Sequence, residues 1–294
     1  MSFKIGLTIQ QVGTILPSVW VKLSNSISLQ HVEFDPTVFD DIDNVRSALR
    51  CNSVTVHAPF IDFWPYDMSS GGKKQKLVEQ FIENVNQNAK DLHIHSVVVH
   101  PPAGPSPNMD LFYEHLNNLK PLVLLENLSY LDPFSSQWSS WETFSRFYRM
   151  TNEHLDKSTG FCFDIPHSFI QNAEKFLDLP EFLITELKGR NGYIHLSGGL
   201  RTEDTHYPSL TEGEIPMNLV KRFLDQIKFR GIVNMELKPQ LDRGGIVGEL
   251  EKILQSYELL LGWAGAQKHR MLLNLKKHFI LDKIKKVERT TRRE

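Results

Sequence analysis

The segment Gly192-Tyr193-Ile194-His195-Leu196-Ser197 joins a short apolar run to a histidine and then to a Ser-Gly-Gly sequence. The apolar run predicts a short buried strand, and the two glycines end it. Asp204 and His206 follow on a predicted loop, two positions apart, so that both side chains can face the same way. Two imidazoles and a carboxylate at the carboxyl end of a strand predict a metal site if other strands end in the same way.

Seven further segments have the composition of short buried strands. They span residues 4–9, 31–34, 53–57, 96–100, 122–126, 160–164 and 231–236. Most are apolar throughout rather than alternating, which is typical of parallel strands that are covered on both faces. Helical patterns lie between them, over residues 36–49, 72–92, 108–119, 139–157, 172–186, 215–228 and 246–262. In residues 72–92, apolar side chains recur at helical spacing, at Leu77, Phe81, Val85 and Ala89.

Eight strands that alternate with helices predict a (β/α)8 TIM barrel, and we expect it to span residues 1–265. A doubly wound open sheet is the alternative. The first strand is not followed by the glycine-rich loop that a dinucleotide-binding fold needs, so the barrel is favoured.

Residues 266–294 form a basic C-terminal tail. Ten Lys and Arg against three acidic residues in 268–294 leave this tail at about +7 and the rest of the chain at about −9. Apolar residues from Met271 to Ile284 recur at helical spacing, which predicts an amphipathic helix packed on the barrel. Contact with the phosphate backbone of a nucleic acid is the alternative role for the tail.

The overall composition is that of an ordinary globular protein. Of 294 residues, 40% are hydrophobic and 23% charged, and the formal net charge of −2 points to neither nucleic acid nor membrane. The two cysteines, Cys51 and Cys162, form no disulfide framework and suit a reducing compartment. With no signal-peptide pattern and no long apolar run, we expect a cytoplasmic protein without a membrane span.

Six of the eight predicted strands end on a side chain that can bind a metal ion, and three more such side chains lie just beyond strand ends. The nine candidate ligands are His57, His100, Glu126, Asp164, His167, His195, Asp204, His206 and Glu236. In a barrel of parallel strands these ends meet at one rim, where so many polar groups need a cation to balance them. Imidazoles mixed with carboxylates favour Zn²⁺, Mn²⁺, Fe²⁺ or Co²⁺. Nine ligands suffice for two or three ions, so we expect one to three per chain.

Each candidate also has an ordinary structural interpretation. A lone histidine such as His57 or His100 is more often a hydrogen-bonded core residue. Three carboxylates at equivalent strand ends, Glu126, Asp164 and Glu236, are harder to explain in this way, because Asp and Glu are almost never buried unpaired. The remaining histidines are interpreted as structural: His31, His93, His95, His115, His154, His269 and His278.

The order of these motifs resembles the xylose isomerase-like TIM barrels, which include sugar isomerases and epimerases and nucleases of the endonuclease IV type. The matching motifs are His57-Ala-Pro, His100-Pro, Glu126-Asn, Asp164-x-x-His167, His195-Leu-Ser, Asp204-x-His206 with Glu212-Gly-Glu-Ile behind it, and Glu236. The resemblance implies that Glu126, Asp164, His195 and Glu236 are the metal ligands that sugar epimerases share. It implies that the other five complete the nine-ligand, three-metal pattern of endonuclease IV.

Two loops depart from the nuclease pattern. Residues 59–67 are aromatic and acidic, and residues 10–13 likewise lack the side chains with which such nucleases enter DNA. A partial resemblance, through Glu126-Asn127 and Asp204-Thr-His206, points to the multi-iron barrels that oxidise cysteine residues in peptides. His167 fits that group less well.

The sequence therefore favours an isomerase or epimerase acting on a small sugar or polyol. Glu126 and Glu236 would act as acid and base on either side of the substrate carbon, and His167 would hold a substrate oxygen. Three aromatic residues would line the pocket, although packing of the barrel against its loop explains them equally well: Phe60, Phe63 and Trp64. Phosphodiester hydrolysis at abasic sites in DNA is the alternative, supported by the extra ligands and the basic tail. A barrel that only binds a metal or ligand is the non-enzymatic interpretation.

Overall fold

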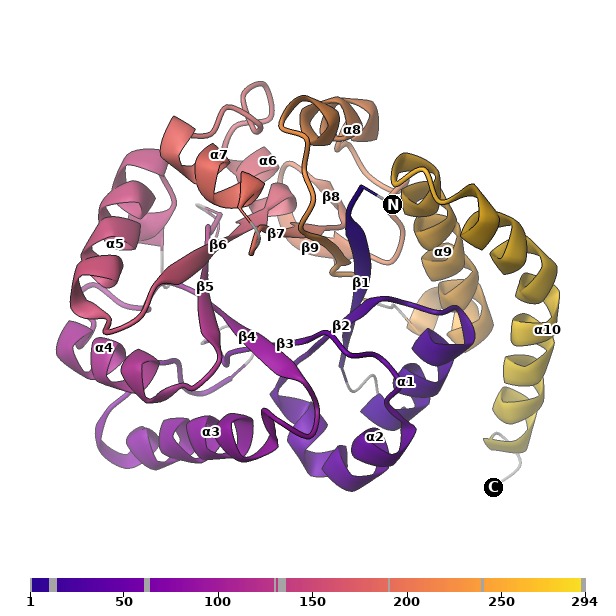
Figure 1. The fold of residues 1–294 in the computed structure, drawn as a ribbon, viewed down its shortest axis with the longest axis horizontal. Coiled ribbons are helices and arrows are strands. Elements are labelled where there is room, and N and C mark those ends of the chain that lie inside the picture. The colour runs from indigo at the N-terminus through magenta and orange to yellow at the C-terminus, as the bar shows by residue number, and fades with distance from the viewer. Residues whose placement is uncertain are drawn as a thin grey trace.

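Eight parallel strands form a closed barrel with helices around its outer wall (Figure 1). The computed structural model describes residues 2–10, 15–60, 64–129, 131, 136–189, 191–238 and 241–291. The strand order around the barrel is β1-β10-β7-β6-β5-β4-β3-β2. The strands are β1 Lys4–Ile9, β2 His31–Phe34, β3 Val54–His57, β4 Ile94–Val99, β5 Leu122–Glu126, β6 Thr159–Asp164, β7 Tyr193–Leu196 and β10 Ile232–Met235. The predicted (β/α)8 barrel is confirmed.

Helices connect the strands and cover the outside of the barrel. They are α1 Pro17–Ser26, α2 Ile42–Ala48, α3 Gln75–Asn88, α4 Met109–Asn118, α5 Trp141–His154, α6 Ile165–Gln171, α7 Glu181–Lys188, α8 Met217–Gln226 and α9 Leu241–Trp263, with short 3-10 helices at Pro36–Asp41, Gly72–Lys74 and Ser136–Trp138. Asn108 before α4 and Ser140 before α5 each accept a hydrogen bond from a backbone N–H of the first turn, which fixes where these helices begin.

Some helical predictions are wrong in detail. The sequence does not predict α1, which begins at Pro17, a residue suited to the first turn of a helix. The predicted helix 172–186 starts only after Pro180, because proline disfavours helical geometry in the residue before it. In α3, Leu77 is 45% exposed whereas Val78 is fully buried, so the apolar face is centred one position further along than predicted.

Alternate residues of each strand face the barrel interior and the surrounding helices. In β2, Val32 and Phe34 belong to the large apolar core between strands and helices. His31 and Glu33 face inward, where both hydrogen-bond to side chains of β7. A separate small apolar cluster inside the barrel comes from the other strands: Val98, Leu124, Cys162, Tyr193 and Ile232. Because buried polar groups need hydrogen-bond partners, the inward side chains of β2 require specific partners on other strands.

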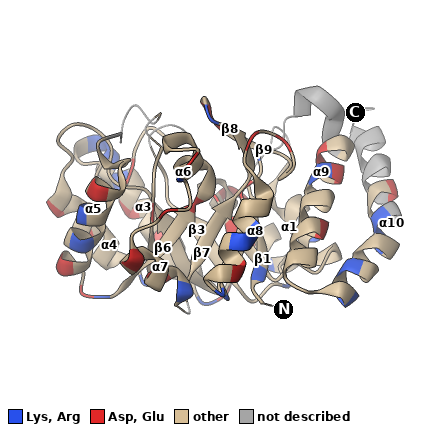
Figure 2. Cartoon of the chain, turned by 90° about the horizontal axis from the view of Figure 1, so that it is seen from above, with Lys and Arg blue, Asp and Glu red and all other residues tan. Residues whose placement is uncertain are grey.

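A hairpin follows β7 and extends from the end of the barrel opposite the N-terminus (Figure 2). Its strands are β8 Gly198–Leu200 and β9 Glu203–Tyr207. Gly199 O accepts a 2.8 Å hydrogen bond from Glu214 N. The backbones approach so closely that a Cβ at Gly213, whose φ is +97°, would lie 2.2 Å from Gly199 O. Glycine at this position therefore allows the following loop to hold the hairpin.

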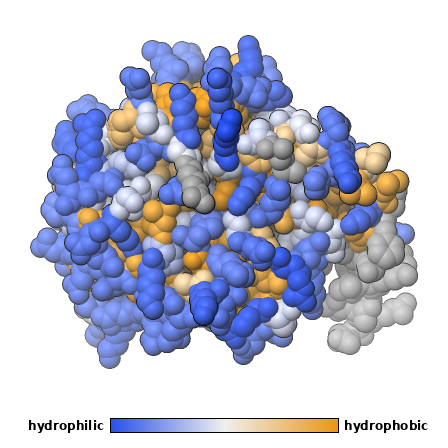
Figure 3. Space-filling model, in the orientation of Figure 1, coloured by the Kyte–Doolittle hydropathy of each residue, from blue (hydrophilic) through white to orange (hydrophobic). Residues whose placement is uncertain are grey.

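The chain ends in two long helices, α9 and α10 Gln267–Thr291. α10 lies outside α9 at the edge of the molecule (Figure 1), with Leu273 and Leu281 buried. Met271 and Leu275 are 60% and 72% exposed, and apolar side chains are visible at this edge in Figure 3. The helix predicted for the tail is present, whereas its division from the barrel as a separate segment stays a prediction. No helix among the described residues is long and apolar enough to span a membrane.

Candidate metal centre

The carboxyl ends of the strands bring the predicted ligands to one rim of the barrel. His57, Glu126 and Asp164 are the last residues of β3, β5 and β6. His195 is the penultimate residue of β7. His100 and Glu236 directly follow β4 and β10. All six strands run in the same direction, so these ends meet at one rim.

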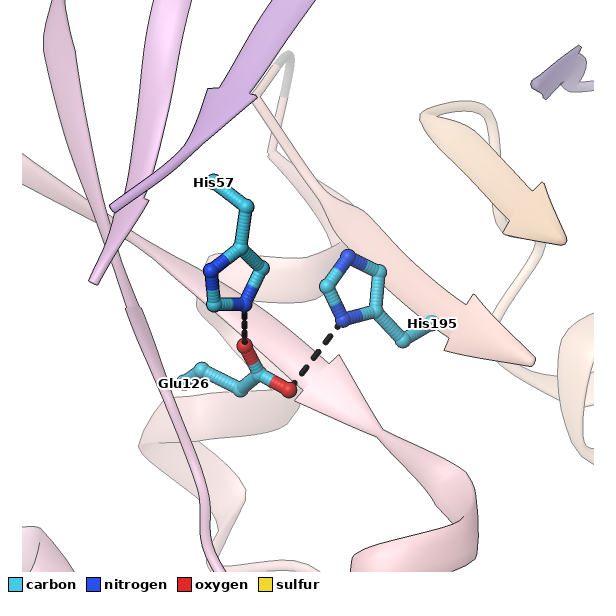
Figure 4. Close-up of side chains that lie close together, drawn as sticks. All are labelled: His57, Glu126 and His195. Atoms are coloured by element: carbon cyan, nitrogen blue, oxygen red, sulfur yellow. Dashed lines mark hydrogen bonds and ion pairs between the residues drawn. The ribbon is translucent and has the colours of Figure 1, made fainter. Parts of the chain in front are cut away.

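Glu126 lies at the centre of four imidazoles. Its Oε2 is 3.1 Å from His57 Nε2 and 3.2 Å from His100 Nε2. Its Oε1 is 3.1 Å from His195 Nδ1 and 3.6 Å from His167 Nδ1. Figure 4 shows His57 and His195 each directed at one of the two carboxylate oxygens. Because Glu126 is fully buried, these imidazoles replace the water that would otherwise solvate its charge.

His195 connects this group to two further carboxylates. Its Nδ1 is 3.1 Å from Glu236 Oε2 and 3.8 Å from Asp164 Oδ2. One ligand atom from each of Glu126, Asp164, His195 and Glu236 lies within 4.8 Å of the other three. Four donors from β5, β6, β7 and the end of β10 are therefore close enough to share one ion.

The hairpin brings Asp204 and His206 to the same rim. Asp204 Oδ1 is 3.4 Å from His167 Nε2 and 3.8 Å from His206 Nε2, and His206 Nδ1 is 3.4 Å from Glu236 Oε2. Ligand atoms of Asp164, His167 and His206 form another group within 4.8 Å of one another. All nine predicted ligands are thus connected by contacts of 3.8 Å or less.

Asn127 holds two of these ligands in place. Its side-chain amide exchanges two 2.9 Å hydrogen bonds with the backbone of Asp164, donating to the carbonyl oxygen and accepting from the N–H. Asp164 in turn caps α6 by accepting from His167 N. His167 Nδ1 lies 2.8 Å from Asn127 O. A hydrogen bond at Nδ1 leaves Nε2 of His167 directed towards Asp204, or towards an ion between them.

Burial and mutual charge control the protonation of the cluster. Burial alone would raise the pKa of Glu126, but the neighbouring imidazoles, that of His195 first, lower it well below its usual range. Burial raises the pKa of Asp164 to about 8. Burial opposes a charge on His195, but the carboxylates of Glu33, Glu126 and Glu236 raise its pKa well above the usual value. Protons on Asp164 and His195 therefore balance the carboxylates in the absence of a cation.

The donor set fits a divalent transition-metal ion. Asp164 Oδ2 is buried without a hydrogen-bond partner among the described residues. Glu236 Oε2 lies 3.1 Å from His195 Nδ1, but the angle does not fit a hydrogen bond, so this oxygen also has no hydrogen-bond partner among the described residues. Buried oxygens of this kind are costly unless a cation satisfies them. Five imidazoles and four carboxylates are the ligands that Zn²⁺, Mn²⁺, Fe²⁺ and Co²⁺ prefer. The assignment of individual ligands to ions stays a prediction.

Of the two predicted pocket aromatics that the structure describes, Phe60 lies against the site. The ring centroid of Phe60 is 5.2 Å from that of His57 and 4.5 Å from that of His100. Trp64 is half-buried and packs on Tyr66, with centroids 6.4 Å apart. Phe63 lies outside the described residues, as does most of the loop after β1 at 11–14. Phe60 thus covers two outer ligands, and its contact with substrate stays a prediction.

Glu33 is a site residue that the sequence reasoning missed. It lies within β2, is fully buried, and its Oε2 is 2.8 Å from His195 Nε2. The criterion used for strand-end carboxylates would have found it, because a glutamate inside a short apolar strand is equally hard to bury unpaired. His31 and His95, interpreted as structural, lie at the amino ends of β2 and β4, away from the rim.

Residues 22–257 match the family described as xylose isomerase-like TIM barrel. The chain belongs to the xylose isomerase-like TIM barrel family. The expected family is therefore confirmed. A search of curated proteins gave no matching sequence.

Solved structures similar to this xylose isomerase-like barrel include both epimerases and a nuclease. A D-tagatose 3-epimerase-like protein is 18% identical with a TM-score of 0.57, over 93% of this chain and 99% of that chain. The 3-keto-D-glucoside 4-epimerase of E. coli is 13% identical with a TM-score of 0.58, over 81% and 94%. Endonuclease IV from Thermus thermophilus is 16% identical with a TM-score of 0.59, over 90% and 99%. At these identities the similarity shows the shared fold alone.

Proposed function

We propose that this barrel is a metal-dependent enzyme that binds two or three divalent ions at its rim and hydrolyses a phosphodiester. The supporting observation is that nine potential ligands, rather than four, meet there. A transition-metal ion takes roughly four to six ligands. Five ligands lie outside the one-ion group of the sugar epimerases. A one-ion enzyme can use His167 to hold a substrate oxygen, but four others also contact members of that group or each other: His57, His100, Asp204 and His206. A one-ion isomerase, which the sequence favours because of its loops, leaves these side chains unexplained.

Divalent ions held by this donor set would supply Lewis-acid chemistry, activating water as a nucleophile and neutralising charge on phosphate oxygens. The protein's own contribution is to hold the ligands and to exclude bulk water. Glu126, Asp164 and His195 are fully buried, and in such a low-dielectric site electrostatic interactions are stronger than in water. The side chains of Asp204 and Glu236 are 29% and 12% exposed, so they mark the side from which a substrate approaches.

Two features near the rim suit a metal-bound anionic substrate: a neutral imidazole that can bind the ion, and a positive charge that can attract the anion. Burial, together with the positive charge of Lys238, lowers the pKa of His206 to about 4, so this imidazole is neutral and able to bind an ion at neutral pH. The backbone N–H of Lys238 also donates a 3.1 Å hydrogen bond to His206 O, which keeps the backbone at Lys238 beside the hairpin that carries His206. The positive charge of Lys238 would attract a phosphate. The basic tail would add a weaker, salt-dependent attraction for a nucleic acid.

Isomerisation or epimerisation of a small sugar or polyol is the second candidate. It is supported by the compact group in which Glu126 and Glu236 both lie 3.1 Å from His195 Nδ1, because an acid and a base must flank the same substrate carbon. In this reaction His167 would hold a substrate oxygen. Phe60, which lies against two of the imidazoles, would contact the apolar face of the sugar.

The two candidates differ in their need for the extra ligands. Protein loaded with Zn²⁺ or Mn²⁺ is incubated with a DNA duplex that carries one abasic site, and separately with ketohexoses in D2O. We expect strand cleavage that is lost on chelation and in His206→Ala, but retained in the control His269→Ala, an exposed residue of α10. Absence of cleavage by protein that holds two or more ions contradicts the hydrolase. Deuterium incorporation into a sugar, by protein that holds one ion, supports the epimerase instead.

A further inference from the structure

Glu33 is buried inside the barrel, and both of its oxygens accept hydrogen bonds. Oε2 is 2.8 Å from His195 Nε2 and accepts a 2.9 Å bond from Tyr193 OH. Oε1 accepts from Thr8 Oγ1 at 3.0 Å and from Asn234 Nδ2 at 3.4 Å. The donors belong to β1, β7 and β10, so three strands hold one carboxylate of β2 in a single orientation.

A row of hydrogen bonds continues from Tyr193 to the opposite end of the barrel. Tyr193 OH is 2.9 Å from His31 Nε2, His31 Nδ1 is 3.0 Å from Ser53 Oγ, and Ser53 Oγ is 3.1 Å from His95 Nε2. The hydroxyl of Tyr193 donates its single proton to Glu33, so its oxygen accepts from His31. His31 then accepts from Ser53, which accepts from His95. Every donor along the row points towards Glu33.

The neighbouring strands are shaped to hold this row. Gly6 of β1 lies in register with His31, and a Cβ there would come within 2.6 Å of His31 Cδ2. At the far end, His95 Nδ1 is 2.7 Å from Ser96 Oγ, which is 2.7 Å from Thr55 Oγ1. Both ring nitrogens of His31 and of His95 are therefore hydrogen-bonded, and neither ring can turn without breaking these bonds.

We propose that Glu33, supported by Tyr193, is a positioning residue that keeps a proton on Nε2 of His195 and presents Nδ1 to a divalent ion. Nδ1 is the atom that lies 3.1 Å from both Glu126 Oε1 and Glu236 Oε2, inside the group that can share an ion. A carboxylate that accepts the other N–H of a metal-binding histidine fixes the ring and makes it a stronger ligand. This role rests on the proposed metal centre, but it does not depend on which reaction the centre catalyses.

The test compares metal affinity in matched variants. Glu33→Gln keeps the shape of the side chain and removes its charge. Its affinity for Zn²⁺, measured by competition with a chelator, should fall by about 10- to 100-fold, while the number of ions bound at saturation stays the same. Tyr193→Phe removes one hydrogen bond to Glu33 and should cause a smaller loss. His269→Ala, on the surface of α10, should bind Zn²⁺ as the wild type does.

A spectroscopic signal separates positioning from a general effect on stability. In Co²⁺-loaded protein labelled with ¹⁵N-histidine, the Nε2–H of His195 should give a paramagnetically shifted signal that exchanges slowly, because Glu33 accepts that proton. In Glu33→Gln the signal should exchange faster or disappear. Folded Glu33→Gln with unchanged Zn²⁺ affinity and an unchanged signal overturns the proposal. If Glu33→Gln does not fold, Tyr193→Phe decides by the same two measurements. Wild-type protein that binds ions but cleaves no phosphodiester overturns the proposed reaction alone.

Discussion

Nδ1 of His195 lies 3.1 Å from Oε1 of Glu126, although 69 positions separate the two residues in the chain. The closed barrel makes this contact, because β5 and β7 both pair with β6 and end at the same rim. Motifs that are far apart in sequence thus become ligands of one centre. Substitutions of individual ligands, and of the residues that position them, should therefore have different effects on activity, stability and metal binding.

Glu236→Gln should abolish activity with little effect on stability. Glu236 Oε2 has no hydrogen-bond partner among the described residues. When Glu236 is made neutral, Glu126 still lies 3.1 Å from His195 Nδ1 as a counter-charge, so the free energy of unfolding should fall by no more than about 1–2 kcal/mol. Because Glu236 is expected to bind the ion directly, its substitution should reduce activity by more than the roughly 10- to 100-fold that is typical of residues that hydrogen-bond to ligands. Assays of kcat/KM and thermal unfolding check this, with exposed Glu142→Gln as the control. Full activity in Glu236→Gln refutes its role as a ligand.

Metal binding should release protons and should weaken as the pH falls. The pKa of Asp164 is about 8, so metal-free protein carries a proton there at pH 7, and an ion must displace it. The proton that His195 carries in the metal-free protein must be displaced as well. Affinity should therefore rise with pH, and the contribution of Asp164 to that rise should fade above about pH 8. Titration calorimetry in buffers of different ionisation enthalpy should find at least about one proton released per chain at pH 7, and fewer at pH 9. Metal binding at pH 7 without proton release would exclude Asp164 as a ligand.

Gly213→Ala should displace the hairpin that carries Asp204 and His206. The position has a φ of +97°, and the new Cβ would meet Gly199 O at 2.2 Å. We expect the free energy of unfolding to fall by about 1–3 kcal/mol and fewer ions to bind per chain. Gly72→Ala is the matched control, because its φ is +62° and nothing lies within 4 Å of the added Cβ. Gly72→Ala should lose some stability but bind as many ions as the wild type. Equal numbers of bound ions in Gly213→Ala and Gly72→Ala would contradict the role given to the hairpin.

The rim positions of His57, Glu126 and Asp164 can be predicted from the sequence, since parallel strands bring their carboxyl ends together whatever the lengths of the connections. The positions of Asp204 and His206 cannot, because the course of the hairpin depends on backbone contacts across the following loop. The only trace of such contacts in the sequence is the presence of glycines, and a glycine does not indicate which backbone it approaches.

Two other features were hidden for different reasons. α1 has the sequence Pro-Ser-Val-Trp-Val-Lys-Leu-Ser-Asn-Ser, in which β-branched and serine residues have weak helix propensity, so packing of Trp20 and Val21 into the core decides its structure. Glu33 was missed because the prediction considered carboxylates at strand ends, whereas Glu33 lies inside a strand, where the same signal of a carboxylate in an apolar run is present. Its partner His195 is across the barrel, and only the closed fold shows that the two residues meet.

Charge reversal on α10 tests whether the tail attracts nucleic acid. Lys268 and Lys276 are exposed, so Lys268→Glu with Lys276→Glu should weaken non-specific DNA binding and lower the slope of log affinity against log salt by about one per lysine. Lys90→Glu, an exposed residue on the barrel, should change neither quantity as much. Equal effects at Lys90 and on α10 would argue against a specific role for the tail.

The number of ions bound per chain tests the central claim most directly. Protein is stripped with a chelator, loaded with Zn²⁺ or Mn²⁺, freed of excess metal by gel filtration and measured by elemental analysis. Nine connected ligands predict two or three ions per chain, falling in His57→Ala and in His206→Ala but unchanged in His269→Ala. A loaded wild-type protein that retains no ion, or a single ion unaffected by loss of His57 and His206, would contradict the multi-ion centre.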